Sequence, residues 1–213
     1  RVYTLHIAEG ELEPEIKMLK YESSGDYTIG YDLQIGTPMF YNNTNRAYAD
    51  FGGLPFEGAA YIAPYGDDWS NPLFNIQRPE SGQSVAAMDW ITFRINKSAN
   101  VYIVNNLNPT SNGKYMGWLQ NWEKVRDYTD ASTVKDAAGE AKSVFKRTFH
   151  VEPGETATIA LQNMGLYGNR MYSVVVEWLE DTSYLNLKNI KIDGSEIPDF
   201  DAETLEYNDV QVA

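Results

Sequence analysis

The feature that most constrains this fold is the alternation of apolar and polar residues along several short stretches. In residues 27–35, every odd position is apolar and every even position is small or polar. A β-strand points successive side chains to opposite faces, so this period places one face on a core and the other in water. Fifteen tyrosines among the 213 residues favour the same fold, because bulky rings fit a half-buried pleated surface. The sequence therefore predicts an all-β chain.

Further strands follow from the same pattern. Residues 90–95 alternate, residues 96–100 have turn composition, and residues 101–104 are apolar again, which predicts a hairpin. Residues 143–151 and 156–161 predict a second hairpin around the turn at 152–155. Residues 171–178 are apolar at both parities in their middle, as expected of a central strand covered on both sides.

Other segments lack a clean period. Residues 123–142 include a candidate short helix at 131–141. The links 64–86 and 105–117 are long and irregular, and long loops in compact domains are usually functional or mobile. Near the end, Asp193-Gly194 between alternating runs predicts a two-residue hairpin turn. We place a module boundary at about residues 180–183, where the sequence texture changes.

Charge and composition exclude several classes of function. The formal net charge of −13 repels phosphate backbones and anionic lipid, so we expect neither a nucleic-acid nor a membrane partner. The absence of cysteine excludes disulfides, thiolate zinc sites and cysteine nucleophiles. No window approaches the roughly 18 apolar residues of a membrane span. The chain opens at Arg1 within a strand-like run, so we expect a fragment of a longer polypeptide.

A set of short motifs resembles a known bacterial β-sandwich. The motifs are Leu33-Gln-Ile-Gly36, Tyr48, Leu54-Pro-Phe-Glu-Gly-Ala-Ala-Tyr-Ile62, Trp90-Ile-Thr-Phe93, Ala99-Asn-Val-Tyr-Ile103, Trp118-Leu119 and Met171-Tyr-Ser-Val-Val-Val176. Over roughly residues 30–178 they resemble the accessory sandwich of polysaccharide lyases and glycoside hydrolases. In that family an Asp-x-Arg-like stretch usually follows the strand that matches residues 101–104, whereas this chain has Asn105 to Lys114. No ligand role of that arginine carries over.

The two ends resemble a cadherin-like β-sandwich spacer. The final segment resembles its opening strands through residues 185–192, Gly194, Phe200 and Tyr207, and residues 1–7 resemble its closing strand. The domain expectation is a spacer strand at 1–13, a jelly-roll-like antiparallel sandwich at 14–182 and a partial β module at 183–213. Either the sandwich lies between two spacers, or both ends complete one spacer around it.

Catalytic motifs are absent from the sequence. His6 and His150 lie on separate predicted strands, with no His-Glu-x-x-His, no phosphate-binding glycine loop and no Gly-x-Ser-x-Gly. Thirty acidic residues make a glycosidase pair easy to imagine but impossible to identify without distances. We therefore expect no catalytic residues. Asp67 and Asp68 are weak candidates for calcium ligands, and no other cofactor is expected.

Sugar binding needs flat aromatic faces together with amides, carboxylates or arginine for the hydroxyl groups. Two tryptophans four residues apart, Trp118 and Trp122, lie in a polar stretch, and in an extended strand both would share one side. We interpret Trp118 as core and leave Trp122 open between core and platform; Trp90 and Trp178 are expected to pack. The candidate stacking residues are Tyr65, Trp69, Tyr115 and Trp122, and the candidate polar contacts are Asp68, Asn71, Arg78 and Asn112.

The expected function is non-catalytic carbohydrate binding within a secreted bacterial enzyme that degrades polysaccharide, extracellular or at the cell surface. Its partners would be a polysaccharide or oligosaccharide and the covalently linked catalytic domain. The alternative is a structural spacer or docking module whose aromatic residues pack on a neighbouring domain. A third hypothesis, that the chain is itself a hydrolase or lyase, requires product release by the isolated chain.

Overall fold

The computed structural model describes residues 13–66, 89–105, 117–152, 154–162 and 172–179, together with two short strands near the C-terminus. This part of the chain contains no α-helix, and none of its helical segments has the length and apolarity needed to cross a membrane. The elements are β1 (Ile16–Tyr21), β2 (Thr28–Gly30), β3 (Pro38–Phe40), β4 (Asn43–Asp50), β5 (Ala60–Ala63), β6 (Asp89–Ile95), β7 (Ala99–Asn105), the 3-10 helix η2 (Gly117–Asn121), β8 (Glu123–Arg126), β9 (Lys135–Asp136), β10 (Ser143–Phe149), β11 (Ala157–Gln162), β12 (Ser173–Trp178), β13 (Lys191–Ile192) and β14 (Ser195–Glu196).

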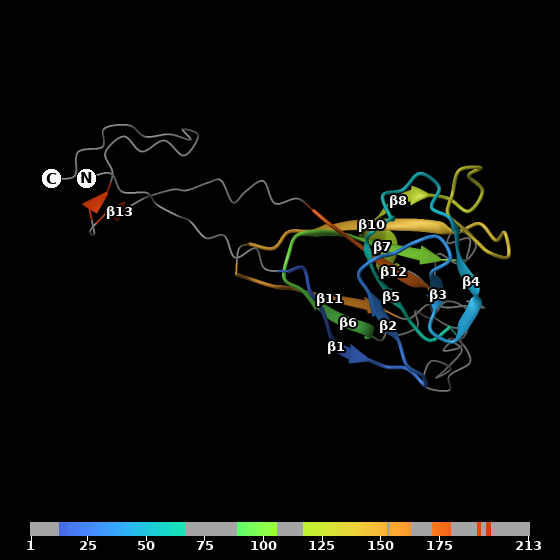
Figure 1. The fold of residues 1–213 in the computed structure, drawn as a ribbon, viewed down its shortest axis with the longest axis horizontal. Helices are drawn as coiled ribbons and strands as arrows, with labels where there is room; N and C mark the ends of the chain where they lie inside the picture. Colours follow the sequence, from blue (N-terminus) through green and yellow to red (C-terminus); the bar gives the residue numbers. More distant parts are fainter. Residues whose placement is uncertain are drawn as a thin grey trace. The chain divides into compact units, whose positions relative to one another are not determined.

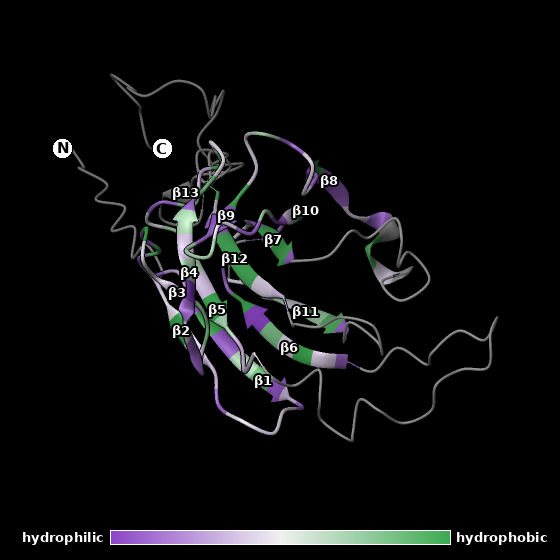
Figure 2. Ribbon diagram, turned by 90° about the vertical axis from the view of Figure 1, so that its right-hand side faces the viewer, coloured by the Kyte–Doolittle hydropathy of each residue, from purple (hydrophilic) through white to green (hydrophobic). Residues whose placement is uncertain are grey.

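The described strands form an antiparallel β-sandwich, which confirms the predicted fold class. A three-stranded sheet has the order β1-β6-β11, and a six-stranded sheet has the order β2-β5-β12-β7-β10-β8. Figure 1 shows β1, β6 and β11 side by side, and Figure 2 shows apolar residues along β12 and the middle of β6. Inward side chains from both sheets, such as Phe93 and Ile159 on one and Ile103 and Val174 on the other, are at most 2% exposed. They belong to one continuous hydrophobic core.

The prediction of a central strand at residues 171–178 is confirmed. Strand β12 pairs with β5 on one side and β7 on the other, and its first four residues are buried. A third sheet, β3-β4-β9, and the loop after β4 account for burial on the outer face. The Tyr48 hydroxyl lies 2.8 Å from the Ser173 hydroxyl, and the Phe56 and Tyr102 rings are 5.0 Å apart.

Both hairpin predictions between long strands are wrong. Strand β6 pairs with β1 and β11, whereas β7 pairs with β10 and β12, so residues 96–98 cross from one sheet to the other. The link between β10 and β11 crosses back in the same way. We call these two links the paired arches. Alternation shows which side of a strand faces the core, but a strand in either layer of a sandwich satisfies the same pattern.

The alternating stretch 27–35 forms only the three-residue strand β2. Leu33 is buried as predicted, but Tyr31 and Ile35 are about half exposed, at 49% and 56%. The chain turns after Asp32, where Thr37 donates its backbone N–H to the Gln34 carbonyl oxygen, and Gly36 has φ 93°. This turn ends the extended run before the alternation ends.

The candidate helix at 131–141 is also absent. The segment holds turns and the two-residue strand β9. One carboxylate oxygen of Asp136 accepts hydrogen bonds from the backbone N–H groups of Ala138, at 3.0 Å, and Glu140, at 2.9 Å. Aspartate that bonds its neighbouring backbone in this way competes with helix formation.

The two C-terminal strands confirm the short hairpin. Lys191 pairs with Glu196, and Ile192 pairs with Ser195, as expected for a two-residue loop at Asp193-Gly194. By its contacts the chain divides into two compact units, Arg1–Leu179 and Glu180–Ala213.

Candidate functional site

The two tryptophans of the polar stretch lie in and just after a 3-10 helix, not in an extended strand. Trp118 is in η2, and the backbone N–H of Trp122 donates to the Leu119 carbonyl oxygen at 2.9 Å. Trp122 follows the last residue of this helix, and the two rings meet there. Their centroids are 5.8 Å apart and the planes are nearly perpendicular, at 88°.

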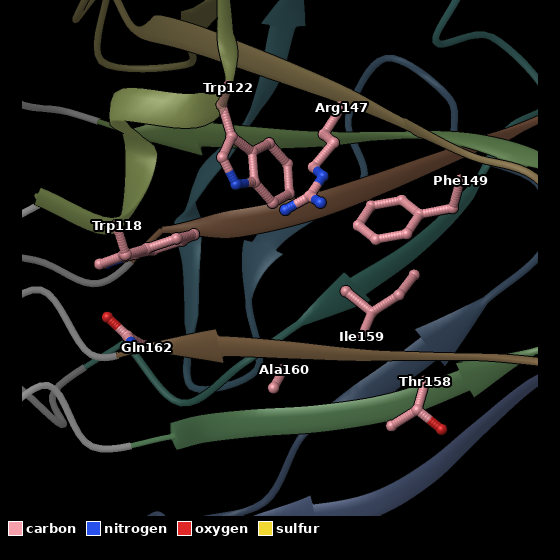
Figure 3. A pocket seen from close by; sticks show the side chains of 8 residues that line it. All are labelled: Trp118, Trp122, Arg147, Phe149, Thr158, Ile159, Ala160 and Gln162. Atoms are coloured by element: carbon pink, nitrogen blue, oxygen red, sulfur yellow. The ribbon is translucent and has the colours of Figure 1, made fainter.

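These rings line a groove on the open side of the sandwich, between β10 with η2 and the edge strand β11. Its volume is about 290 Å³. Figure 3 shows the side chains around it. One wall holds Trp118, Trp122, Arg147 and Phe149, and the other holds Thr158, Ile159, Ala160 and Gln162. We call this site the arginine groove.

Arg147 is the single charged residue among the eight that line the groove. Its guanidinium carbon lies 5.1 Å from the centre of the Phe149 ring, a cation–π contact. Figure 3 shows the guanidinium directed toward the space beside the Trp122 indole. Among the described residues no carboxylate forms an ion pair with Arg147. The carboxylates of Glu123 and Asp127 pair with other cations, Lys146 and Lys124.

The aromatic side chains of the groove continue into the core. The Trp122 ring packs between the Phe149 ring, with 6.2 Å between the ring centroids, and the Trp118 ring. The Trp118 ring in turn packs against Tyr172, with 5.7 Å between the centroids. Trp122 is only 9% exposed, whereas Trp118 is partly buried and packs against the core. The buried Nε1 of Trp118 donates to none of the described residues. The groove therefore offers a well-fixed aromatic wall of limited exposed area.

Tyr65 and Trp122 are the predicted site residues that fall on the described chain. Trp122 lines the groove and Tyr65 does not. Tyr65 is partly buried, its backbone N–H donates to the Tyr21 hydroxyl at 2.6 Å, and its ring covers Gly25, where an added Cβ would lie 2.3 Å from the ring. The remaining candidates lie outside the described residues: Trp69, Tyr115, Asp68, Asn71, Arg78, Asn112 and the calcium candidate Asp67.

Sequence reasoning missed Arg147, although a signal for it exists. Arg147 has the same parity as Phe145 and Phe149 on β10, so an inward-facing strand position carries a charge. A charge on the core-facing side of a strand is costly unless it reaches water or a partner. Such a break in an apolar face marks the mouth of a cleft.

A second cluster of charges lies away from the groove, against the third sheet. Lys142 Nζ lies 2.6 Å and Arg46 Nη1 2.8 Å from Asp136 Oδ2, and the Lys142 and Asp136 side chains are fully buried. Glu140 completes the cluster at 2.8 Å from Arg46. Burial acts to raise the pKa of Asp136, but the hydrogen bonds from Lys142 and Arg46 outweigh it and leave that pKa below its ordinary value.

The Asp136 cluster is a structural staple, since every oxygen of the aspartate is occupied by protein donors. Among the described residues, no group of three or more His, Asp or Glu side chains could hold a metal ion. The calcium prediction rests on residues outside this part of the chain.

No protein-family model matches the chain, and no curated protein matches it. Among solved structures, the chain is similar to "a beta-glucuronidase from glycoside hydrolase family 2", with 17% identical residues and a TM-score of 0.46. The similarity covers 76% of this chain and 14% of the enzyme chain, so this chain spans a small part of that enzyme's length.

Proposed function

We propose that this chain is a non-catalytic carbohydrate-binding module of a secreted bacterial enzyme that degrades polysaccharide, and that the arginine groove is part of its binding surface. The observation that carries the proposal is the placement of indole and phenyl rings beside Arg147 and Gln162 in one open groove. Aromatic rings suit the apolar face of a pyranose, and a few fixed polar groups suit its hydroxyls.

The size of the groove supports a small occupant. Ligand pockets usually measure about 300–1,000 Å³, and this groove lies at the lower end of that range. It would hold one sugar unit of a polymer that continues past both ends. Such a contact is weak alone, and attachment to a catalytic domain raises it through effective concentration. In this proposal the module acts outside the cell or at its surface, together with its parent enzyme.

Filling the groove tests the proposal. The Gln162 side chain lies on the Trp118 side of β11 and lines the groove (Figure 3), whereas Gln34 is exposed in the turn after β2, outside the groove. Neither side chain is buried, so Gln162→Trp and Gln34→Trp should both fold. In affinity gels containing a panel of polysaccharides, we expect wild type and Gln34→Trp to be retarded and Gln162→Trp to migrate freely. Equal retardation of both variants would place binding elsewhere, and Trp69→Ala then tests the loop candidates.

The rival function, a spacer or docking module without a ligand, is favoured by one observation. Trp122 is 9% exposed, which leaves little of its face for stacking. Under that alternative the wild-type chain migrates freely in every polysaccharide gel, and Gln162→Trp changes nothing. Product release from a polymer by the isolated chain would instead indicate an enzyme.

A further inference from the structure

We propose that the arginine groove recognises an acidic sugar, with the carboxylate of a uronate residue held by Arg147. This inference rests on the proposed carbohydrate-binding function and names the class of sugar. The chain carries a net charge of −13, yet the one charged residue lining the groove, Arg147, is positive.

The state of Arg147 supports an external anion. The neighbouring cations on this edge have protein partners, because Lys146 Nζ lies 3.1 Å from Glu123 and Lys124 Nζ lies 2.9 Å from Asp127. Arg147 has no such carboxylate among the described residues, and its side chain is exposed to solvent. Its charge is therefore available to a ligand.

The geometry of Arg147 favours a carboxylate over an isolated hydroxyl. Its contact with the Phe149 ring limits the positions of the guanidinium. A planar guanidinium offers parallel N–H donors that match the two oxygens of a carboxylate, and a lysine at the same place would offer only a point charge. A uronate ring against the aromatic wall would place its carboxylate beside the guanidinium, with Gln162 near its hydroxyls.

The test compares each acidic polymer with its own neutral form. Polygalacturonate and alginate are carboxyl-reduced chemically, which removes the charge and keeps the sugar backbone, and a sulfated carrageenan provides a second anion. We expect the wild-type chain to bind at least one uronate polymer about fivefold more tightly than its reduced form, the size expected of an exposed charge pair. Sulfated polymer should bind less well than uronate.

Variants assign the preference to one side chain. Arg147→Gln should bind the acidic and reduced polymers equally, because the preference for the charged form is lost with the guanidinium. Arg147→Lys should keep only part of the preference. Lys17→Gln removes one positive charge from an exposed position on β1, at the edge of the three-stranded sheet opposite β11, and should keep the whole preference. Thermal melting verifies that each variant is folded.

The outcomes separate the two proposals. Equal binding of acidic and reduced polymers by wild type, or an undiminished preference in Arg147→Gln, overturns the uronate inference and leaves carbohydrate binding standing. Tighter binding of the sulfated polymer assigns the groove to sulfate and also overturns it. Failure to bind any polymer in any form removes the proposed function together with the inference.

Discussion

At the scale of single residues, the cations of this chain have two different fates. Lys142 is fully buried, and the carboxylate of Asp136 compensates its charge. Arg147 remains without a carboxylate partner among the described residues and lines the groove. A buried pair contributes little net stability, but removing one partner leaves an uncompensated buried charge. The two cations therefore respond differently to substitution.

Asp136→Asn should lower the free energy of unfolding by about 3 kcal/mol at neutral pH, because it leaves the buried Lys142 with only the partly exposed carboxylate of Glu140, at 3.6 Å. Denaturant titration measures the loss. Asp127→Asn is the matched control, since Asp127 pairs with Lys124 at the protein surface and should change stability much less. Equal effects of the two substitutions would show that the Asp136 cluster is no staple.

The same residue predicts a pH dependence. The pKa of Asp136 is lower in the folded chain than in the unfolded chain, so between the two values the unfolded chain binds more protons. The contribution of Asp136 is therefore present above its unfolded pKa and is lost as the pH falls through its folded pKa. The stability gap between wild type and Asp136→Asn should narrow below about pH 4. A gap that stays constant down to pH 2 would contradict this.

Alanine substitutions at two adjacent glycines distinguish the cost of backbone strain from the cost of steric crowding. Gly52 and Gly53 have φ 61° and 72°, but a Cβ on Gly52 would lie 2.5 Å from the Ser132 carbonyl oxygen, whereas a Cβ on Gly53 meets nothing within 4 Å. Gly53→Ala should cost about 1–2 kcal/mol from left-handed strain alone. Gly52→Ala should cost clearly more, because the 132–134 backbone must move. Denaturant titration of both variants checks the order.

At the scale of elements, the sequence predicted the strands better than their partners. Residues 171–178 were correctly placed at the centre of a sheet, because apolar residues on both parities need cover on both faces. The pairing of β6 with β7 was wrong, since short links suit a hairpin and an arch equally well. The helix η2 was missed because Trp118 and Trp122 meet in either conformation. Of the residues that line the groove, only Trp122 was predicted as a site residue. The residues of β11 are distant from it in sequence, and the sequence does not show which strands come together.

The paired arches are joined by one side chain. The Ser98 hydroxyl oxygen, in the first arch, accepts a hydrogen bond from the Val151 backbone N–H in the second, at 2.9 Å. Ser98→Ala should lower the free energy of unfolding by about 1–3 kcal/mol, because it leaves a largely buried N–H without a partner. Ser132→Ala, at an exposed turn, is the control for thermal melting. An unchanged melting temperature for Ser98→Ala would mean that the arches hold together without this bond.

At the scale of the whole molecule, the net charge of −13 opposes the approach of a polyanion that the arginine groove would bind. Long-range repulsion is screened as the Debye length falls from about 30 Å at 0.01 M salt to about 10 Å at 0.1 M. The association rate with a uronate polymer should therefore rise over this range, whereas the rate with its reduced form should stay constant. Surface plasmon resonance measures both rates. A rate that falls with salt would indicate attraction by a wider basic surface.

The paired arches also affect how the sandwich comes apart. Strand β6 is tied to β7 by three residues, and β10 is tied to β11, so each of the two sheets holds one strand from each covalent pair. Because of these short covalent links, one sheet cannot separate from the other without pulling on β6 or β7 and on β10 or β11. We therefore expect amide protons in the middle of β6 and of β7 to exchange with deuterium in a single cooperative opening, at one common rate set by global unfolding.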